Sequence, residues 1–301
     1  MGSRSMIGSA VLALAALVGA GCGSTKDAAS APAAAAERGK VLVIVSSRSA
    51  ITLRENKSHP TGYFFNELVV PVRALVDDGW EVVFANPEGN PPSMDPSSLS
   101  AEFFGGDVKK LESYEAFHEG LADLKAPQKL ATVVAGGLDG FDGVFFPGGH
   151  APMEDLCKDR SVAAVLRHFH EAGKPTAAIC HGPIALVSTA KDPDALLAAL
   201  ERNEAAPAAK AAEGWPYAGY RMTIFSTVEE KQAEAKGLGG EVRFYPDEAL
   251  RTAGGIVEVA GPNRSQVVHD RELITGQNPA SDEALAKALL EALAERRAGA
   301  K

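Results

Sequence analysis

The sequence has few cysteines and no excess of basic residues. It contains only three cysteines in 301 residues, Cys22, Cys157 and Cys180, and no pair has the Cys-x-x-Cys spacing of a zinc or thioredoxin-type site. This scarcity excludes a small disulfide-stabilised scaffold. The formal net charge is −9 and no basic stripe is present, which argues against nucleic acid as a partner. What remains is an ordinary globular composition with enough apolar residues for a core.

The N-terminal region carries an apolar run, Met6–Ala20, that is short for a membrane span. Arg4 precedes the run and small residues end it, a pattern typical of a secretory signal peptide. The segment GAGC at residues 19–22 then resembles a bacterial lipobox, although that motif usually has Leu at the place of Gly19. The resemblance implies lipidation of Cys22, contact with a membrane only through this anchor, and a periplasmic or cell-envelope location. A cleaved signal with an incidental cysteine, and therefore a secreted protein, is the alternative.

The rest of the chain divides into a short linker and one folded domain. Residues 23–38 are small, polar and rich in Ala and Pro, as in a flexible tether. No repeat and no second core is evident after them. We therefore expect a signal peptide over residues 1–22, a linker over 23–38 and an α/β domain over 39–301. An Ala-, Glu- and Lys-rich stretch at 191–219 looks like a surface insertion in that domain.

Short, continuously apolar runs alternate with helical patterns along the domain. The runs Lys40–Val45 and Pro175–Ile179 indicate strands buried inside the sheet. Further strands are expected at Glu81–Ala85, Phe141–Phe146, Met222–Phe225 and Leu273–Gly276. The helical patterns lie at Gly62–Asp78, Ser113–Leu124, Ser161–Ala172, Val228–Lys236 and Pro279–Arg297. The alternation predicts a single doubly wound, mainly parallel sheet with helices on both faces.

The strongest chemical signal is the segment AAICHGP, Ala177–Pro183. A buried strand ends at Cys180 and a helix follows, so the cysteine would occupy a strand–turn–helix elbow at the carboxyl edge of the sheet. Ligands bind at this edge in open α/β sheets. The N-terminus of the following helix would favour a thiolate, and Gly182 would allow close backbone approach. A buried, inert cysteine at the end of a strand is the alternative.

Two further segments could supply groups to the same edge. In FFPGGH, Phe145–His150, two glycines follow a buried strand, and their backbone N–H groups, with that of His181, could bind a developing oxyanion. A plain βα turn is the alternative. Glu67, in TGYFFNE, would lie in the second turn of a helix among apolar neighbours. Partial burial would raise its pKa and suit it to proton transfer, whereas a solvated glutamate on the helix face is the alternative.

These segments, together with LITGQNPAS at Leu273–Ser281, occur in the order found in the ThiJ/PfpI superfamily. Over about residues 40–297, the chain resembles the branch of that superfamily that contains glutathione-independent glyoxalase III enzymes and heat-shock chaperones. The resemblance implies the flavodoxin-like form of the doubly wound fold, which class I glutamine amidotransferases share. It also implies a homodimer.

The resemblance assigns roles to individual residues. It implies that Cys180 is the nucleophile, that His181 is the adjacent catalytic histidine, and that Glu67 is the acid that hydrogen-bonds the sulfur. In this branch, the third member of the triad is an acidic residue after the next strand. Glu229 and Glu230 both lie there, and position favours Glu230.

Three residues of the FFPGGH segment, Gly148, Gly149 and His150, match the oxyanion and substrate-binding site of the family. The chain departs from the family pattern at two places near the mouth of the expected pocket. Ala151 stands where a glycine usually follows the GGH histidine, and residues 191–219 look inserted. Both departures concern the choice of substrate more than the chemistry.

The activity that the resemblance implies is conversion of methylglyoxal, or a related 2-oxoaldehyde, into a 2-hydroxy acid, with neither glutathione, metal nor another cofactor. A stress chaperone or protein-repair factor that acts through an apolar surface is a second hypothesis. A cysteine peptidase is a third, because relatives share the elbow. A glutaminase is disfavoured, since its histidine normally lies on a distant loop and here His181 follows the nucleophile directly.

Overall fold

The computed structural model describes residues 38–299 of the chain. The predicted signal peptide with Cys22, and all but the last residue of the predicted linker, lie outside the described residues, so these predictions stay predictions. Within residues 38–299, no helix combines the length and the apolar character needed to cross a membrane.

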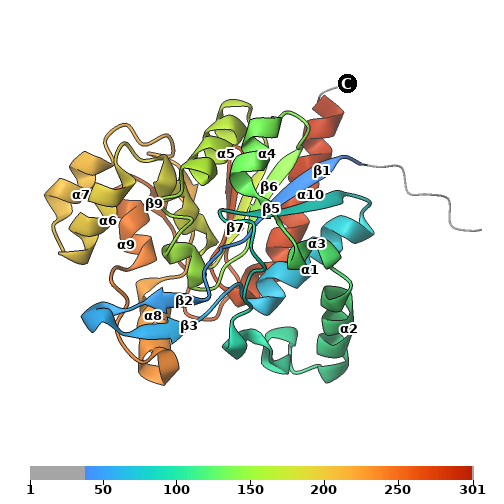
Figure 1. Cartoon of the computed structure of the whole chain (residues 1–301), viewed down its shortest axis with the longest axis horizontal. Helices are drawn as coiled ribbons and strands as arrows, with labels where there is room; N and C mark the ends of the chain where they lie inside the picture. The colour runs from blue at the N-terminus through green and yellow to red at the C-terminus, as the bar shows by residue number, and fades with distance from the viewer. Residues whose placement is uncertain (1–37, 300–301) are drawn as a thin grey trace, which may run out of the picture. The chain divides into compact units, whose positions relative to one another are not determined.

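A seven-stranded sheet forms the centre of the domain (Figure 1). In spatial order its strands are β10 (Val267–Asp270), β11 (Leu273–Gly276), β7 (Thr176–Ile179), β6 (Gly143–Phe146), β1 (Lys40–Ile44), β4 (Glu81–Asn86) and β5 (Gln128–Lys129). Every neighbouring pair is parallel except β10 and β11, which are antiparallel. The predicted doubly wound, mainly parallel sheet is therefore confirmed.

Helices cover both faces of this sheet (Figure 1). One core includes residues of α1 (Phe65–Asp77), α3 (Ala122–Lys125) and α10 (Asp282–Gly299), with α2 (Val108–Glu119) packed against it. The other core includes residues of α4 (Leu130–Gly136), α5 (Arg160–Glu171), the 3-10 helix η5 (Gly182–Thr189), α6 (Pro193–Glu201), α7 (Ala205–Ala211) and α9 (Pro246–Thr252). The remaining helix, α8 (Thr227–Ala233), continues into the π-helix η6 (Glu234–Leu238). Short 3-10 turns in the connections are η1 (Arg54–Asn56), η2 (Pro96–Ser98), η3 (Ala101–Phe104), η4 (Ala151–Met153) and η7 (Pro279–Ser281).

Successive residues of the central strands enter the two cores in turn. Val41 and Val43 of β1 belong to the core that contains α1 and α10, whereas Leu42 and Ile44 belong to the core that contains α5. All four side chains are fully buried. Because neither face of the strand meets water, no polar residue interrupts the run, and this explains the continuous apolar signal in the sequence.

Two small sheets lie outside the central one. They are the antiparallel pair β2 (Ala50–Thr52) and β3 (Ser58–Pro60), and the parallel pair β8 (Arg221–Met222) and β9 (Ile256–Val257). The strand predicted at Met222–Phe225 is confirmed only at Met222, where β8 ends, and β8 pairs with β9 outside the central sheet. Ile224 is nevertheless fully buried, so burial without sheet pairing produced the same apolar signal as a central strand.

The stretch 191–219, expected at the surface, contributes to the core. It forms α6 and α7, and the segment after them buries Trp215 and Tyr217. The indole N–H of Trp215 donates to the carbonyl of Leu186 at 2.9 Å, and the hydroxyl of Tyr217 donates to the carbonyl of Leu166 at 3.2 Å. These bonds tie the stretch to η5 and α5, so it is a packed part of the domain.

Candidate active site

Cys180 follows β7 directly, at the carboxyl edge of the sheet. Its φ is +57°, in the left-handed region that side chains other than glycine rarely adopt. Two backbone hydrogen bonds hold it there. The N–H of Cys180 donates to the carbonyl of Gly276 at 2.9 Å, and its carbonyl accepts from the N–H of Phe225 at 3.0 Å. The turn has the geometry of the predicted elbow, and its neighbours stabilise an otherwise unfavourable backbone.

Glycines pack against this turn where no side chain would fit. A Cβ at Gly148 would lie 2.4 Å from Oε2 of Glu67 and 2.6 Å from the Cβ of Cys180. A Cβ at Gly182 would lie 2.3 Å from the carbonyl oxygen of Phe146. The loop after β6, the first turn of α1 and the elbow therefore meet at Gly148. The structure brings together the three segments that the sequence analysis singled out.

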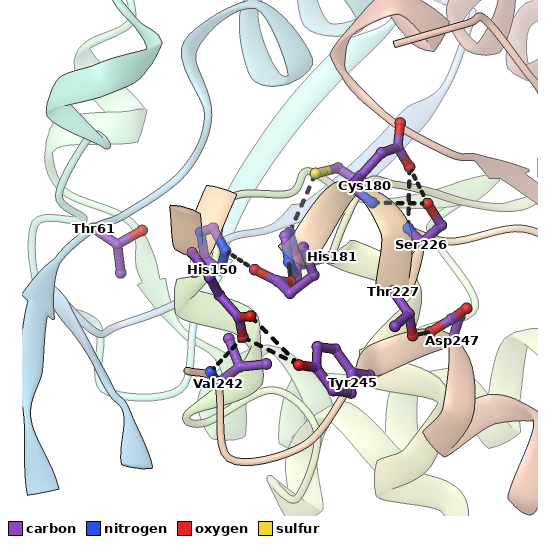
Figure 2. A network of polar contacts seen from close by, with 12 residues as sticks. Thr61, His150, Cys180, His181, Ser226, Thr227, Val242, Tyr245 and Asp247 are labelled. Carbon is purple, nitrogen blue, oxygen red and sulfur yellow. Dashed lines mark hydrogen bonds and ion pairs between the residues drawn. The ribbon is translucent and has the colours of Figure 1, made fainter. Parts of the chain in front are cut away.

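A continuous chain of polar contacts links Cys180, His181 and Glu230. Its first contact, between Cys180 and His181, is drawn in Figure 2. Sγ of Cys180 lies 3.2 Å from Nδ1 of His181, and Nε2 of His181 lies 2.7 Å from Oε2 of Glu230. All three residues are buried. Because an ionised carboxylate only accepts hydrogen bonds, Nε2 carries the hydrogen. In a neutral imidazole, Nδ1 is then free to accept the thiol proton.

The start of α8 decides which of two adjacent glutamates faces His181. Ser226 caps the helix, and its side chain and that of Glu229 form a capping box. Glu229 also accepts hydrogen bonds from two amide side chains in the loop after β11, at 2.8 and 2.7 Å. Glu229 is thereby tied to the helix end. The structure places Glu230, and not Glu229, beside the imidazole.

Glu67 lies near the sulfur, in the first turn of α1 rather than in the second as predicted. It is fully buried, and neither of its carboxyl oxygens has a hydrogen-bond partner within residues 38–299. Burial raises the pKa of Glu67 well above its ordinary value. The Cys180 thiol lies beside the carboxyl, although the two groups do not have the geometry of a hydrogen bond. The thiol lowers the pKa of Glu67, but by less than burial raises it. The predicted direction of the pKa shift is confirmed.

The prediction of a ready thiolate at Cys180 is wrong. Burial raises the pKa of the thiol well above its ordinary value, and the Glu67 carboxyl raises it further. The backbone N–H of Gly149 lowers the pKa but does not outweigh these effects. The sulfur therefore needs a base that removes its proton as it reacts, and Nδ1 of His181 is in contact with it.

The backbone at Gly149 approaches the sulfur, as the predicted oxyanion site requires. Gly149 has a φ of +90°, and a Cβ there would lie 2.1 Å from the carbonyl oxygen of Gly62, so only glycine fits. Its N–H stabilises negative charge on the Cys180 sulfur. The structure thus places Gly148 and Gly149 beside Cys180.

The imidazole of His150 is engaged with Glu230 rather than with the backbone groups of the predicted oxyanion site. Nε2 of His150 lies 2.7 Å from Oε1 of Glu230. The centroid of the His150 ring lies 4.2 Å from that of His181, and both rings lie near Phe225. Sequence reasoning missed this contact because the two residues stand 80 positions apart. His150 follows β6 of the central sheet, whereas Glu230 lies on α8 after β8 of a small separate sheet, so the order of the strands gave no signal for this contact.

The two imidazoles that share Glu230 have pKa values shifted in opposite directions. Burial acts to raise the pKa of Glu230, but the two imidazoles hold it well below its usual range. Burial acts to lower the pKa of His150, but Glu230 raises it above the ordinary value. Burial and the neighbouring His150 lower the pKa of His181 despite Glu230. The proton of the cluster therefore favours His150, and His181 is the neutral imidazole.

The same cluster has the spacing of a metal site. Within residues 38–299, donor atoms of His150, His181 and Glu230 lie within 4.8 Å of one another. Two imidazoles and a carboxylate form a donor set that transition metals accept. However, Nε2 of His150 and Nε2 of His181 each already face an oxygen of Glu230 at 2.7 Å. Hydrogen bonds therefore account for the arrangement of these three side chains.

Known proteins resemble this chain in sequence. The model of the ThiJ/PfpI family-like group matches residues 59–233, more than half of the chain. Among curated relatives, a Staphylococcus aureus protein named protein/nucleic acid deglycase HchA is 28% identical over 253 residues. The match covers 82% of this chain and 77% of that relative.

Solved structures share the fold. The 24 kDa rapid encystment protein of Francisella tularensis is 21% identical, with a TM-score of 0.61, and the match covers 85% of this chain and 99% of that one. Glyoxalase III from Candida albicans is 19% identical, with a TM-score of 0.57, and the match covers 85% and 98%. The family match includes the segments that carry Glu67, Cys180 and Glu230. The chain therefore belongs to the ThiJ/PfpI family.

Proposed function

We propose that this protein is a cysteine-dependent enzyme that converts methylglyoxal, or a related 2-oxoaldehyde, into a 2-hydroxy acid without glutathione. The observation that carries the proposal is the position of the Cys180 sulfur beside one basic and one acidic group. Nδ1 of His181 lies 3.2 Å from the sulfur. The buried carboxyl of Glu67 and the side chain of Cys180 both pack against Gly148. The deglycase name of the Staphylococcus aureus relative supports chemistry of this kind.

The first step uses the thiol, His181 and Glu67. As Sγ of Cys180 bonds to the aldehyde carbon, Nδ1 of His181 accepts the thiol proton and the carbonyl π electrons move to oxygen. The developing oxyanion accepts a hydrogen bond from the N–H of Gly149 and takes the proton of Glu67, which gives a hemithioacetal. The step requires a neutral imidazole and a neutral carboxyl, and the directions of both pKa shifts favour these forms.

The next steps move a hydrogen from one carbon to the other. The Glu67 carboxylate removes the proton from the former aldehyde carbon, while the His181 imidazolium protonates the ketone oxygen, which gives an enediol. Glu67 then returns its proton to the former ketone carbon, and His181 takes the proton from the other hydroxyl. The product is a thioester of the 2-hydroxy acid. Methylglyoxal would thus be reduced at one carbon and oxidised at the other, with no external oxidant.

Water completes the reaction. It attacks the thioester carbon and gives a proton to the Glu67 carboxylate, the S–C bond breaks, and the His181 imidazolium protonates the sulfur. The thiol, the neutral imidazole and the neutral carboxyl are restored. The sum is methylglyoxal plus water giving lactic acid.

The test is lactate formation from methylglyoxal by the purified protein with no thiol cofactor added. We expect Cys180→Ser to lose about 10³-fold or more of the turnover. Cys157→Ser is the matched control, because Cys157 is a second buried free cysteine, whose thiol donates to the carbonyl of Met153 at 3.1 Å, outside the site. A Cys180→Ser protein that still formed lactate at the wild-type rate would refute the assignment.

Deglycation is a second candidate, favoured by the relatives named deglycase over 82% of the chain. The Cys180 sulfur would attack the carbon that joins methylglyoxal to an amine, and the amine would leave with the proton from His181. The discriminating experiment presents a preformed amino-acid adduct while a separate scavenger removes free methylglyoxal. Faster amine release with enzyme and scavenger than with scavenger alone supports deglycation. Equal rates would mean that the enzyme acts only on free methylglyoxal.

Location, assembly and the two other activities are also open to direct tests. We propose a lipid anchor on Cys22, so the Cys22→Ser protein should be absent from the membrane fraction. We also propose a homodimer, which analytical ultracentrifugation would detect. Suppression of aggregation that survives Cys180→Ser would favour a chaperone. Casein cleavage that is lost in the same variant would favour a peptidase.

A further inference from the structure

His150 joins the candidate site from a third segment of the chain. It lies between the loop after β6 and η4, whereas His181 follows β7 and Glu230 belongs to α8. Glu230 is fully buried, and each of its oxygens faces one imidazole nitrogen at 2.7 Å. A carboxylate that is held through both oxygens has little freedom to rotate away from His181. His150 therefore determines where Glu230 points as much as His181 does.

We propose that His150 is a positioning residue that fixes Glu230 and carries the positive charge of the cluster, so that His181 stays a neutral base. This inference rests on the proposed function, in which Nδ1 of His181 removes the thiol proton. It takes the place of the oxyanion role that the family resemblance implied for His150, since the side chain is bonded to Glu230.

The charged groups around the two imidazoles favour this division of labour. His150 faces three carboxylates, Glu230 of α8, Glu234 of η6 and Asp95 of the loop after β4, and the imidazole of His181. His181 faces the carboxylates Glu230 and Glu229 of α8, the His150 imidazole and the Cys180 thiol. Burial lowers both imidazole pKa values, and only at His150 do the carboxylates more than offset it.

Solvent exposure separates the two imidazoles in the same sense. The side chain of His150 is 14% exposed, whereas that of His181 is 1% exposed. A cation loses less hydration at the partly exposed position than at the fully buried one. Hydration and the surrounding charges therefore both place the proton on His150.

The first test measures the protonation of His181 without any substrate. In protein labelled with ¹³C-histidine, an NMR titration gives the pKa of His181, and His181→Asn assigns its signal. His150→Gln keeps a neutral N–H donor near the position of Nε2 but cannot carry the charge. We expect the pKa of His181 to rise by about one unit in this variant, because Glu230 is no longer neutralised. An unchanged pKa would overturn the proposal.

His170 supplies the matched control for this titration. Its Nδ1 lies 2.7 Å from Oε1 of Glu272, so it forms another histidine–carboxylate pair, on α5 and outside the site. His170→Asn keeps a neutral donor there and should leave the pKa of His181 unchanged. An equal shift in both variants would mean that the effect is not specific to His150, and would overturn the proposal.

The second test separates fixation of Glu230 from charge. His150→Phe keeps a ring beside His181 but has no donor, so kcat should fall about tenfold or more while KM changes little. His150→Gln keeps a donor to Glu230, so it should retain more kcat than His150→Phe and move the acid limb of the pH–rate profile upward by about one unit. A rise in KM alone would indicate a substrate-binding residue and overturn the proposal. If the wild-type protein forms no lactate, the proposed function fails, and the NMR titration still decides the role of His150.

Discussion

Glu67→Gln should remove a pH-dependent loss of stability that the wild-type protein carries at its candidate site. Both carboxyl oxygens of Glu67 are buried without a hydrogen-bond partner within residues 38–299, and burial raises the pKa of the group well above its ordinary value. Glutamine has nearly the same size and no charge. The substitution therefore keeps the volume and removes the titration.

The sign follows from proton binding in the two states. The raised pKa means that the folded protein keeps the Glu67 proton to a higher pH than the unfolded chain does. The contribution of Glu67 to stability is fully present below the ordinary value of 4.5 and is lost as the pH rises toward the folded pKa. Each pH unit over which Glu67 is protonated in the folded state alone costs about 1.4 kcal/mol.

The assay is urea unfolding of wild type and Glu67→Gln from pH 4.5 to 7.5. The difference in unfolding free energy should move in favour of the variant as the pH rises above 4.5, with a slope of up to about 1.4 kcal/mol per pH unit. Glu102→Gln, at an exposed glutamate in η3, is the control and should give a flat difference. A flat difference for Glu67→Gln as well would refute the reasoning. The variant should also lose turnover, because an amide cannot carry the proton between the two carbons.

Two further predictions concern the groups around the sulfur. Gly148→Ala should abolish lactate formation, because the added Cβ would lie 2.4 Å from Oε2 of Glu67. Circular dichroism should still report a folded domain. A wild-type kcat in this variant would show that the loop can move away from Glu67. Glu230→Gln should lower kcat about 10²-fold or more, whereas Glu229→Gln should cost about 1–3 kcal/mol of unfolding free energy as its capping and amide bonds weaken. The reverse pattern would exchange the roles of the two glutamates.

The middle of the central sheet was predictable because its strands β1, β6, β7 and β11 are buried on both faces. The run Lys40–Val45 has no other plausible location than the middle of a covered sheet. The same criterion failed at Met222–Phe225, where the side chains of Met222, Thr223 and Ile224 are buried but the backbone does not join the central sheet. It also missed β10, whose residues range from buried to exposed and therefore give no continuous apolar signal. Apolar runs report burial, and they report strand pairing only when the two coincide.

The site was predictable as a set of segments and less so as a set of contacts. Strand ends bring Gly148 and Cys180 to one edge, and the spacing of AAICHGP is enough to predict the elbow. The choice between Glu229 and Glu230 depends on the exact start of α8, which a capping box defines. The pKa of Cys180 depends on how deeply the thiol is buried and on a carboxyl from α1, and neither can be read from the residues beside it.

The capping box at the start of α8 gives one short segment two tasks. Glu229 secures the helix end through Ser226 and through the loop after β11, while its immediate neighbour aims a carboxylate at His181. Fraying of this single turn would release Glu230 and leave the seven-stranded sheet intact. Heat can therefore switch off the proposed chemistry at a temperature at which the rest of the domain is still folded, so thermal inactivation and thermal melting are separate properties of this protein.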